Sequence, residues 1–320
     1  MAIVYCVIFI SRFQVLILFL SQMIKPWIHA ARPRTLPLAL SGSILGSFLA
    51  AADGVFRWNI FLLAALTSLL LQILSNLAND YGDFTKGTDN HERIGPDRMV
   101  STGAITPRQM IAAIGLVSSL ALVSGIFLIL QGFPDGNAPL KLTYLALGLA
   151  SIGAAINYTV GKNPYGYSGF GDLFVFIFFG IIAVTGTYFL HGQLLRPEVL
   201  LPAVSLGLLS TGVLNLNNLR DERSDILTNK HTLVVKMGGK WGRIYHATLI
   251  GLAILATALY VALNYHSATQ LLFVISIPLL IRNMVVVLRN TIPADLNVEL
   301  RNLSLSTLFF SITFGIGMIL

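Results

Sequence analysis

The stretch Asn76 to Asp89 reads N-L-A-N-D-Y-G-D-F-T-K-G-T-D and directly follows the apolar run 60–77. Its three carboxylates, Asp80, Asp83 and Asp89, therefore lie at the end of a segment apolar enough to cross a membrane. A carboxylate at the centre of a bilayer costs about 2.5–3.5 kcal/mol on insertion scales, and acids that persist there usually face a cavity or an ion path. The stretch predicts a polar site at the end of a membrane helix.

A second stretch repeats this arrangement. Residues Asn215 to Asp225 read N-L-N-N-L-R-D-E-R-S-D and follow the apolar run 202–214. On a continuing helix, side chains three or four positions apart share one face, so each stretch forms a polar stripe. The members of the two stripes are Asn76, Asp80, Asp83, Asn217, Asp221 and Asp225. If the two helices are neighbours, both stripes face a shared space.

The composition indicates a polytopic helical membrane protein. Hydrophobic residues make up 55% of the chain and charged residues 11%, and the mean hydropathy is +0.76. The alternating ten-residue segments of a membrane β-barrel do not dominate. The net charge of +7 comes from basic residues scattered through short loops, which does not indicate nucleic-acid binding. The single cysteine, Cys6, excludes an internal disulfide and a cysteine metal cluster.

Nine apolar segments are long enough to cross a hydrocarbon core of about 30 Å. They cover approximately residues 36–53, 58–78, 109–131, 140–158, 170–190, 199–218, 245–264, 268–288 and 302–320. The sequence therefore predicts an all-α bundle of nine transmembrane helices, with residues 23–320 forming a single domain. Residues 1–22 form either an extra apolar span or an upstream extension of a chain that begins at Met23, and we assign them no function.

The loops give an independent test of this topology, because lysine and arginine concentrate on the cytoplasmic side of a membrane. With nine spans, seventeen of the 21 basic residues fall on one side of the membrane. Only Arg57, Lys141 and Arg196 fall on the other, and Arg12 lies in the leader. Both acidic stretches then lie on the cytoplasmic face, and we expect a multi-pass protein of a bacterial plasma membrane.

Clustered carboxylates without histidine or cysteine favour a hard cation such as Mg2+. Magnesium bridging to a diphosphate would use the acids for the metal, the basic loops for the phosphate charge and the bilayer for an apolar tail. The simpler alternative is a solvated network in which the acids pair with Lys86, Arg220 and Arg223.

An allylic tail would ionise to a carbocation that needs shelter from water, and aromatic rings stabilise such a cation. Tyrosines and phenylalanines near the predicted site are candidates for this role, although most aromatic residues in membrane helices serve packing. They are Tyr81, Phe84, Tyr158, Tyr165, Tyr167, Phe170, Phe174, Phe176, Phe178 and Phe179.

These motifs and the nine-span plan resemble the UbiA superfamily of intramembrane prenyltransferases. The resemblance covers about residues 25–320 and is closest to the branch that prenylates 1,4-dihydroxy-2-naphthoate in menaquinone synthesis. It rests on R-P-R-T-L-P (32–37), N-D-Y-G-D-F-T-K-G-T-D (79–89), R-I-G-P-D-R (93–98), P-Y-G-Y-S-G-F-G-D-L-F-V-F-I-F-F-G (164–180), N-N-L-R-D-E-R-S-D (217–225) and K-H-T-L-V-V-K-M-G (230–238).

The resemblance implies two aspartate-rich motifs that bind Mg2+ and a prenyl diphosphate. The residues it assigns to the metal are Asp80, Asp83, Asp89, Asp221 and Asp225, with Asn79 and Asn217 beside them. The superfamily's third acid of the first motif is absent, because Gly87 stands at that position and Asp89 follows two residues later.

Basic residues on the same face are candidates for the diphosphate, and we select Lys162 and Arg220 from a set that also includes Lys86, Arg93, Arg98 and Lys230. Asp172 opens an apolar span. It either complements the dipole of a helix N-terminus or contacts the aromatic acceptor.

The resemblance implies transfer of a polyprenyl group to 1,4-dihydroxy-2-naphthoate with loss of carbon dioxide, giving demethylmenaquinone. Within the same fold the acceptor is alternatively 4-hydroxybenzoate, homogentisate, chlorophyllide or haem. A CDP-alcohol phosphotransferase would need a D-G-x-x-A-R core, which is missing. A secondary transporter or magnesium channel would favour broken helices and a midplane polar site. Nothing in the sequence indicates an obligatory protein partner.

Overall fold

The computed structural model describes residues 23–88 and 92–320, and its regular elements within these ranges are all helices. Residues 23–31 are helical and lead into the first element. The elements are η1 Pro33–Thr35, α2 Leu36–Ala52, α3 Trp58–Lys86, α4 Pro107–Gly132, α5 Ala138–Asn157, η2 Tyr165–Tyr167, α6 Gly171–Val175, η3 Phe176–Gly186, α7 Thr187–Gly192, η4 Pro197–Val199, α8 Leu200–Leu227, α9 Leu233–Met237, α10 Gly239–Leu263, η5 Ala268–Ser276, α11 Ile277–Arg289, η6 Pro293–Asp295 and α12 Leu296–Ile319.

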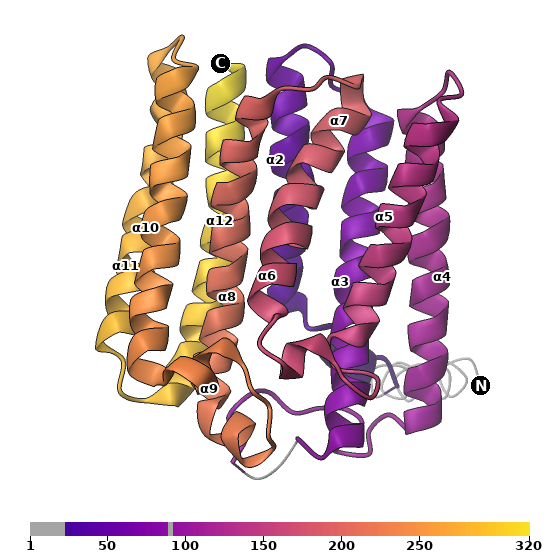
Figure 1. The fold of residues 1–320 in the computed structure, drawn as a ribbon, viewed down its shortest axis with the longest axis vertical. Helices are drawn as coiled ribbons and strands as arrows, with labels where there is room; N and C mark the ends of the chain where they lie inside the picture. The colour runs from indigo at the N-terminus through magenta and orange to yellow at the C-terminus, as the bar shows by residue number, and fades with distance from the viewer. Residues whose placement is uncertain (1–22, 89–91) are drawn as a thin grey trace, which may run out of the picture.

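The described part of the chain contains nine helical segments long and apolar enough to cross a membrane, which confirms the predicted number. The segments are Met23–Ala52, Trp58–Lys86, Pro107–Gly132, Ala138–Asn157, Gly171–Gly192, Pro197–Leu227, Gly239–Leu263, Ala268–Arg289 and Pro293–Ile319. They run up and down side by side (Figure 1). The predictions for residues 1–22, including Cys6, and for Asp89 lie outside the described residues.

Two spans continue well beyond their predicted ends, 78 and 218. Helix α3 runs to Lys86, where Gly87 adopts a left-handed conformation with φ 64° and donates its N–H to carbonyls of the last turn. Helix α8 runs to Leu227. Hydropathy falls where polar residues begin, but a helix ends where its backbone is capped. Residues 76–86 of the first acidic stretch and all of the second are therefore helical, and the two helix ends lie at the same end of the bundle (Figure 1).

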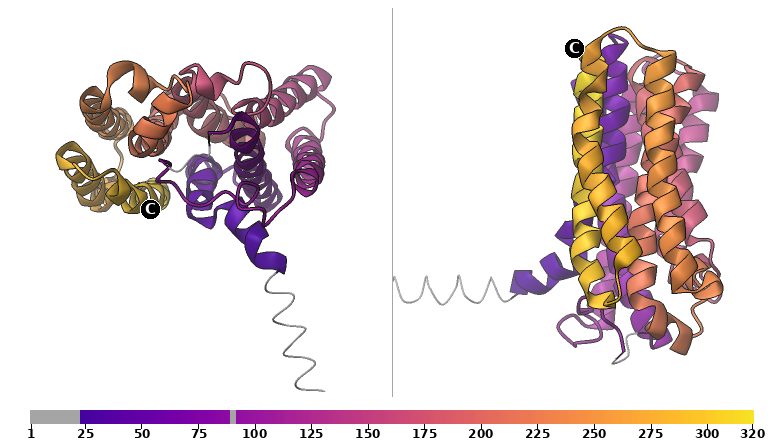
Figure 2. Two further views of the ribbon diagram at one scale, coloured as in Figure 1. Left: turned by 90° about the horizontal axis from the view of Figure 1, so that it is seen from below. Right: turned by 90° about the vertical axis from the view of Figure 1, so that its left-hand side faces the viewer.

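Helix α8 lies at the centre of the packing, against α10, α12 and η3. Its Leu206, Leu209 and Leu216 are fully buried. At the contact with η3 the two backbones touch, since a Cβ added to Gly180 would lie 2.4 Å from the Cα of Gly207. Helices α4 and α5 lie at one side of the bundle and α10 to α12 at the other (Figure 2).

The span 171–192 changes its helical geometry in the middle. Between α6 and α7, the eleven residues of η3 form a π-helix. A π-helix has i→i+5 hydrogen bonds and a wider turn than an α-helix, and it is frequently found at functional sites. The sequence does not predict this, because the segment reads as a uniform apolar run.

A polar network closes the bundle at the end opposite the acidic stretches. The Tyr188 hydroxyl donates to Asp53 Oδ2 (2.5 Å) and Arg196 Nη1 donates to Asp53 Oδ1 (2.6 Å). Arg196 Nη2 also donates to the Asn264 side-chain oxygen (3.0 Å). Asp53 and Arg196 thus bond to each other and to side chains from α7 and from the end of α10. We call these four residues the opposite-face network.

Candidate functional site

The two acidic stretches bury four carboxylates in the last turns of α3 and α8. The exposed fractions are 1% for Asp80, 4% for Asp83, 6% for Asp221 and 4% for Asp225. Carboxylates are rarely buried to this extent unless they are paired. The partners of each acid therefore decide what the site can do.

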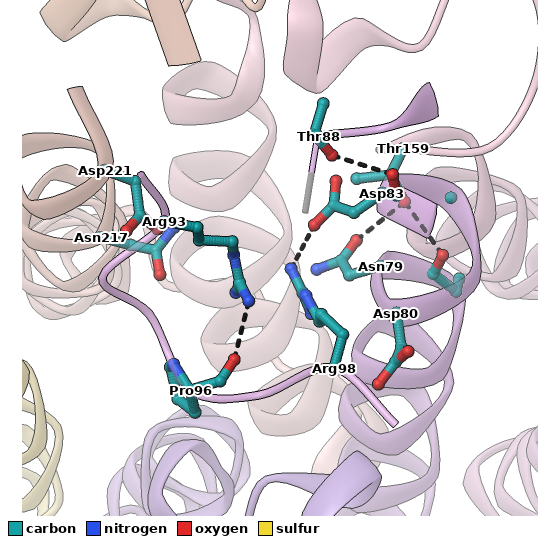
Figure 3. A network of polar contacts seen from close by, with 12 residues as sticks. Asn79, Asp80, Asp83, Thr88, Arg93, Pro96, Arg98, Thr159, Asn217 and Asp221 are labelled. Atoms are coloured by element: carbon teal, nitrogen blue, oxygen red, sulfur yellow. Dashed lines mark hydrogen bonds and ion pairs between the residues drawn. The ribbon is translucent and has the colours of Figure 1, made fainter. Parts of the chain in front are cut away.

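Asp83 and Asn79 lie one turn apart on α3 and both line a cavity inside the bundle. Asp83 forms an ion pair with Arg98, and its Oδ1 accepts a hydrogen bond from the Tyr167 hydroxyl (3.0 Å). Asn79 Oδ1 accepts from the Thr159 hydroxyl (3.1 Å). Figure 3 shows Asn79 and Asp83 on the side of the helix that faces Arg98.

Asp80 lies on a different side of α3 and is not part of the cavity wall. Its two oxygens accept hydrogen bonds from the backbone N–H groups of Met99 (2.9 Å) and Val100 (3.0 Å). Successive helix positions differ by about 100°, so Asp80 points away from its neighbour Asn79. The predicted stripe of Asn76, Asp80 and Asp83 therefore divides, and in this structure Asp80 holds the loop after α3.

In the second stretch Asp221 is paired with the adjacent Arg220, through Nε (2.9 Å) and Nη2 (2.5 Å). The same guanidinium donates to the side-chain oxygens of Asn217 (2.8 Å) and Asn297 (2.9 Å). Arg220 is itself only 2% exposed. It thus fixes the first turn of the motif and links α8 to the start of α12.

Asp225 has a partner on only one oxygen. Lys230 Nζ lies 3.3 Å from Asp225 Oδ1, whereas Asp225 Oδ2 is buried and has no hydrogen-bond partner. Burial alone would lower the pKa of Lys230, but the nearby Asp225, Asp83 and Asp221 raise it above its usual value. Acids of both stretches thus favour the charged form of Lys230.

Tyr167 connects the first stretch to Lys230, the partner of Asp225 in the second stretch. Its hydroxyl contacts Asp83 and the Thr88 hydroxyl (3.1 Å), and its ring centroid lies 5.5 Å from Lys230 Nζ. Burial and the charge of Asp83 raise the pKa of Tyr167, which keeps its hydroxyl neutral. A further link runs from the Ser224 hydroxyl to the Thr88 carbonyl (3.4 Å). The two motifs therefore form one site.

A cavity of about 330 Å³ extends from this site into the bundle. Its polar mouth is formed by Arg32, Asn76, Asn79, Asp83, Asn217 and Lys230. Its deeper wall is mostly apolar and includes Leu71, Leu128, Leu147, Phe178, Ile182 and Leu190. A charged mouth above an apolar interior suits an amphiphile with an anionic head.

The other predicted residues have different positions. Tyr158 lines the cavity, and burial raises its pKa, with a further contribution from Asp172. Asp172 is 7% exposed but does not line the cavity. Lys162 is exposed and lies outside the cavity wall, and Lys86 is exposed with its Nζ 5.7 Å from the Tyr167 ring centroid.

Sequence reasoning missed Arg32 and Gln72, both of which line the cavity. Arg32 enters the sequence analysis as a loop charge and as part of the R-P-R-T-L-P motif but without a role in the site, and Gln72 lies inside an apparently apolar span. A signal was present, because a glutamine in the middle of a membrane helix is expensive unless it is bonded or faces a cavity.

Within residues 23–88 and 92–320, no three acidic, histidine or cysteine side chains are close enough to hold a metal by themselves. The donor set nevertheless fits magnesium, which usually takes one or two carboxylates together with water and substrate phosphate oxygens. The buried, unpartnered Oδ2 of Asp225 is such a donor. Asp83 and Asp221 supply carboxylates close to the same lysine.

Comparison with known proteins agrees with this geometry. The model of the UbiA prenyltransferase family matches residues 39–312. The 1,4-dihydroxy-2-naphthoate octaprenyltransferase of Haemophilus influenzae is 40% identical over 303 residues, covering 94% of this chain and 98% of that protein. The enzyme of the same name from Escherichia coli K12 is 41% identical over 296 residues, covering 92% and 96%.

The fold is also similar to that of a UbiA homolog from Archaeoglobus fulgidus solved with GPP and Mg2+. The TM-score is 0.58 at 13% sequence identity, and the match covers 92% of this chain and 99% of that one. The family match extends over most of the nine spans and includes both acidic stretches. The chain therefore belongs to the UbiA prenyltransferase family.

Proposed function

We propose that this membrane protein transfers a polyprenyl group from a polyprenyl diphosphate to 1,4-dihydroxy-2-naphthoate, with loss of carbon dioxide. The relatives that support this choice of acceptor are similar over nearly their whole length. The observation that carries the proposal is the joining of both acidic stretches at the mouth of one apolar cavity, through Tyr167 and Lys230.

The diphosphate binds at the mouth of the cavity. Arg98, Arg220 and Lys230 are each paired with one acid of the motifs and are almost fully buried. Buried cations with several donors bind phosphate oxygens strongly. Asp83, Asp221 and Asp225 would hold magnesium, with Asn79 and Asn217 beside them, and bound magnesium would neutralise charge on the departing diphosphate.

The prenyl tail occupies the apolar part of the cavity. Tyr165, Phe174 and Phe178 are stacked along its wall, with ring centroids 4.0 Å and 6.0 Å apart. Their π-faces stabilise an allylic cation, and the apolar lining excludes water. The chain's contribution is thus to hold the leaving group, shelter the cation and position the acceptor.

The reaction balances without an oxidant. The bond between the prenyl carbon and the diphosphate oxygen breaks, and the electron pair leaves with the diphosphate. The ring carbon that carries the carboxylate forms the new carbon–carbon bond. The carboxylate then leaves as carbon dioxide, and its bonding electrons restore the aromatic ring, so the product is the quinol form of demethylmenaquinone.

The site faces the cytoplasm of a bacterial plasma membrane. The supporting observation is the concentration of lysine and arginine at the end of the bundle that carries the acidic stretches. A cytoplasmic site would have direct access to a charged aromatic acid.

The direct test is a transfer assay with the purified protein, a polyprenyl diphosphate and Mg2+. We expect pyrophosphate, carbon dioxide and prenylated quinol in equal amounts with 1,4-dihydroxy-2-naphthoate, and no turnover after metal removal by a chelator. The same assay with 4-hydroxybenzoate and homogentisate controls for the acceptor. Turnover of hydroxybenzoate but not dihydroxynaphthoate, or ion flux without pyrophosphate release, would contradict the proposal.

A further inference from the structure

The R-P-R-T-L-P segment at 32–37 contributes a cavity residue in an unusual backbone conformation. Arg32 has φ 50° and ψ 71°, the left-handed region that residues other than glycine rarely adopt. Its carbonyl accepts hydrogen bonds from the N–H (3.0 Å) and the hydroxyl (3.0 Å) of Thr35. The turn thus directs the Arg32 side chain into the wall of the cavity.

Side chains of α3 hold this turn from inside the bundle. Asn76 Nδ2 donates to the Ala31 carbonyl (2.9 Å) and the Thr35 hydroxyl (3.0 Å). Gln72 Nε2 donates to Asn76 Oδ1 (3.2 Å) and the Thr35 hydroxyl (3.3 Å). Because Asn76 Nδ2 donates to the Ala31 carbonyl, Asn76 Oδ1 is the acceptor for Gln72. The Gln72 amide must therefore point its Nε2 towards Asn76 and its Oε1 away from it.

Two polar atoms remain without partners in this otherwise bonded group. Gln72 Oε1 and Arg32 Nη2 are both buried and make no hydrogen bond. Both residues line the cavity, and Gln72 is only 8% exposed. Buried polar groups in folded proteins are almost always hydrogen-bonded, so an unpartnered donor and acceptor in one cavity indicate a ligand. That ligand offers an anionic oxygen and a hydroxyl.

Gln72 lies deeper in the membrane than the diphosphate region, whereas Arg32 belongs to the polar mouth and is linked to Gln72 through Thr35. Gln72 precedes Asn79 by seven residues, which is about 10 Å along α3 on the side away from the cytoplasmic end. In the donor, the carbon that reacts is bonded directly to the diphosphate. An acceptor that attacks this carbon must therefore lie just inside the mouth, between Asn79 and the apolar wall.

We propose that Arg32 and Gln72 recognise the aromatic acceptor, with Arg32 binding its carboxylate and Gln72 Oε1 accepting a hydrogen bond from the neighbouring ring hydroxyl. This assignment rests on the proposed function and deepens it by naming the residues that choose an ortho-hydroxy aromatic acid. The carboxylate loses its charge when it leaves as carbon dioxide. Arg32 therefore stabilises the bound acceptor more than it stabilises the later transition state for loss of carbon dioxide. Substitution of Arg32 therefore raises the KM for the acceptor more than it lowers kcat.

A binding experiment without the prenyl donor tests this independently of turnover. The probe is 1-hydroxy-2-naphthoate, and 1-naphthol, which lacks the carboxylate, is the matched ligand. We expect Arg32→Gln to weaken naphthoate binding roughly 10- to 100-fold and to leave naphthol binding unchanged, because only the charge-assisted bond is lost. Gln72→Met weakens binding of both ligands. Arg108→Gln, an exposed charge at the start of α4, is the control.

Steady-state kinetics and thermal unfolding complete the design. We expect Arg32→Gln to raise the KM for dihydroxynaphthoate while the KM for the prenyl diphosphate and the unfolding temperature stay unchanged. Unaltered naphthoate binding would overturn the assignment. A rise in the donor KM alone would also overturn it and would indicate that Arg32 binds the diphosphate. If the wild-type protein binds 1-hydroxy-2-naphthoate but transfers no prenyl group to 1,4-dihydroxy-2-naphthoate, the proposed function fails while the binding assignment survives.

Discussion

The two ends of the helical bundle both carry an aspartate that pairs with an arginine and a tyrosine, but they differ in whether buried polar atoms remain without hydrogen-bond partners. In the opposite-face network, both oxygens of Asp53 are bonded, to Tyr188 and Arg196. At the acidic end and in the cavity behind it, Asp225 Oδ2, Arg32 Nη2 and Gln72 Oε1 are buried without hydrogen-bond partners. A saturated network stabilises a fold, whereas an incomplete one indicates that a ligand completes it.

Removing an acid from the incomplete end is expected to have the largest effect. Asp225→Asn should lower the transfer rate roughly 10²–10³-fold, because it removes a metal donor and leaves the Lys230 charge without its partner. The rate is measured per folded protein. The matched control is Asp53→Asn at the saturated end, for which we expect less than about twofold. Equal losses at the two ends would remove the distinction between them.

The saturated end should respond in stability. Asp53→Ala leaves the Tyr188 hydroxyl and the Arg196 guanidinium short of a partner, so we expect the free energy of unfolding to fall by about 1–3 kcal/mol. Thermal unfolding in detergent measures this change. Turnover per folded molecule should be unchanged, and a variant that folds normally but is inactive would mean that this end takes part in the reaction.

A pair of tyrosine substitutions sharpens the comparison further. Tyr167→Phe removes the hydroxyl that bonds Asp83 but keeps the ring beside Lys230. We expect kcat/KM to fall roughly tenfold, which corresponds to about 1.4 kcal/mol. Tyr188→Phe makes the same change beside Asp53 and should affect the unfolding temperature only. A fall in kcat/KM for Tyr188→Phe together with unchanged kcat/KM for Tyr167→Phe would show that the two roles are reversed.

The smallest effect is expected for Lys162. This residue was selected from the sequence as a diphosphate contact, and it is exposed and lies outside the cavity wall. An exposed charge acts weakly on a ligand, so Lys162→Ala should raise the donor KM by no more than about threefold. The experiment is a donor titration at high and low salt. A tenfold or larger rise would show that the 161–170 loop closes over the diphosphate.

Much of the fold follows from the sequence, because the bilayer imposes a simple rule on segment length and on loop charge. Nine spans and the placement of both acidic stretches at one end were predicted. The helix ends were not, since α3 stops at the left-handed Gly87 and not where its apolar run ends.

The site was predicted less completely than the fold. Residue spacing predicted Asp83, Asn217 and Asp225 as site residues, and the family resemblance added Asn79. Neither showed that Asp80 holds the Met99–Val100 backbone. The partners of a side chain depend on loops that approach from distant parts of the chain. The same reason hid Arg32 and Gln72, whose importance lies in two unpartnered atoms and not in their residue types.

The π-helical segment η3 sets the shape of the cavity wall. Residues that line the cavity recur at intervals of four along this span: 174, 178, 182 and 186, together with 175, 179, 183 and 187. On a regular α-helix such a row would rotate by about 40° at each step and leave the cavity. Wider turns counteract that rotation and keep the row upright. A one-residue deletion within 176–186 would therefore rotate the aromatic wall away from the prenyl tail, even if the deleted residue is not one that lines the cavity.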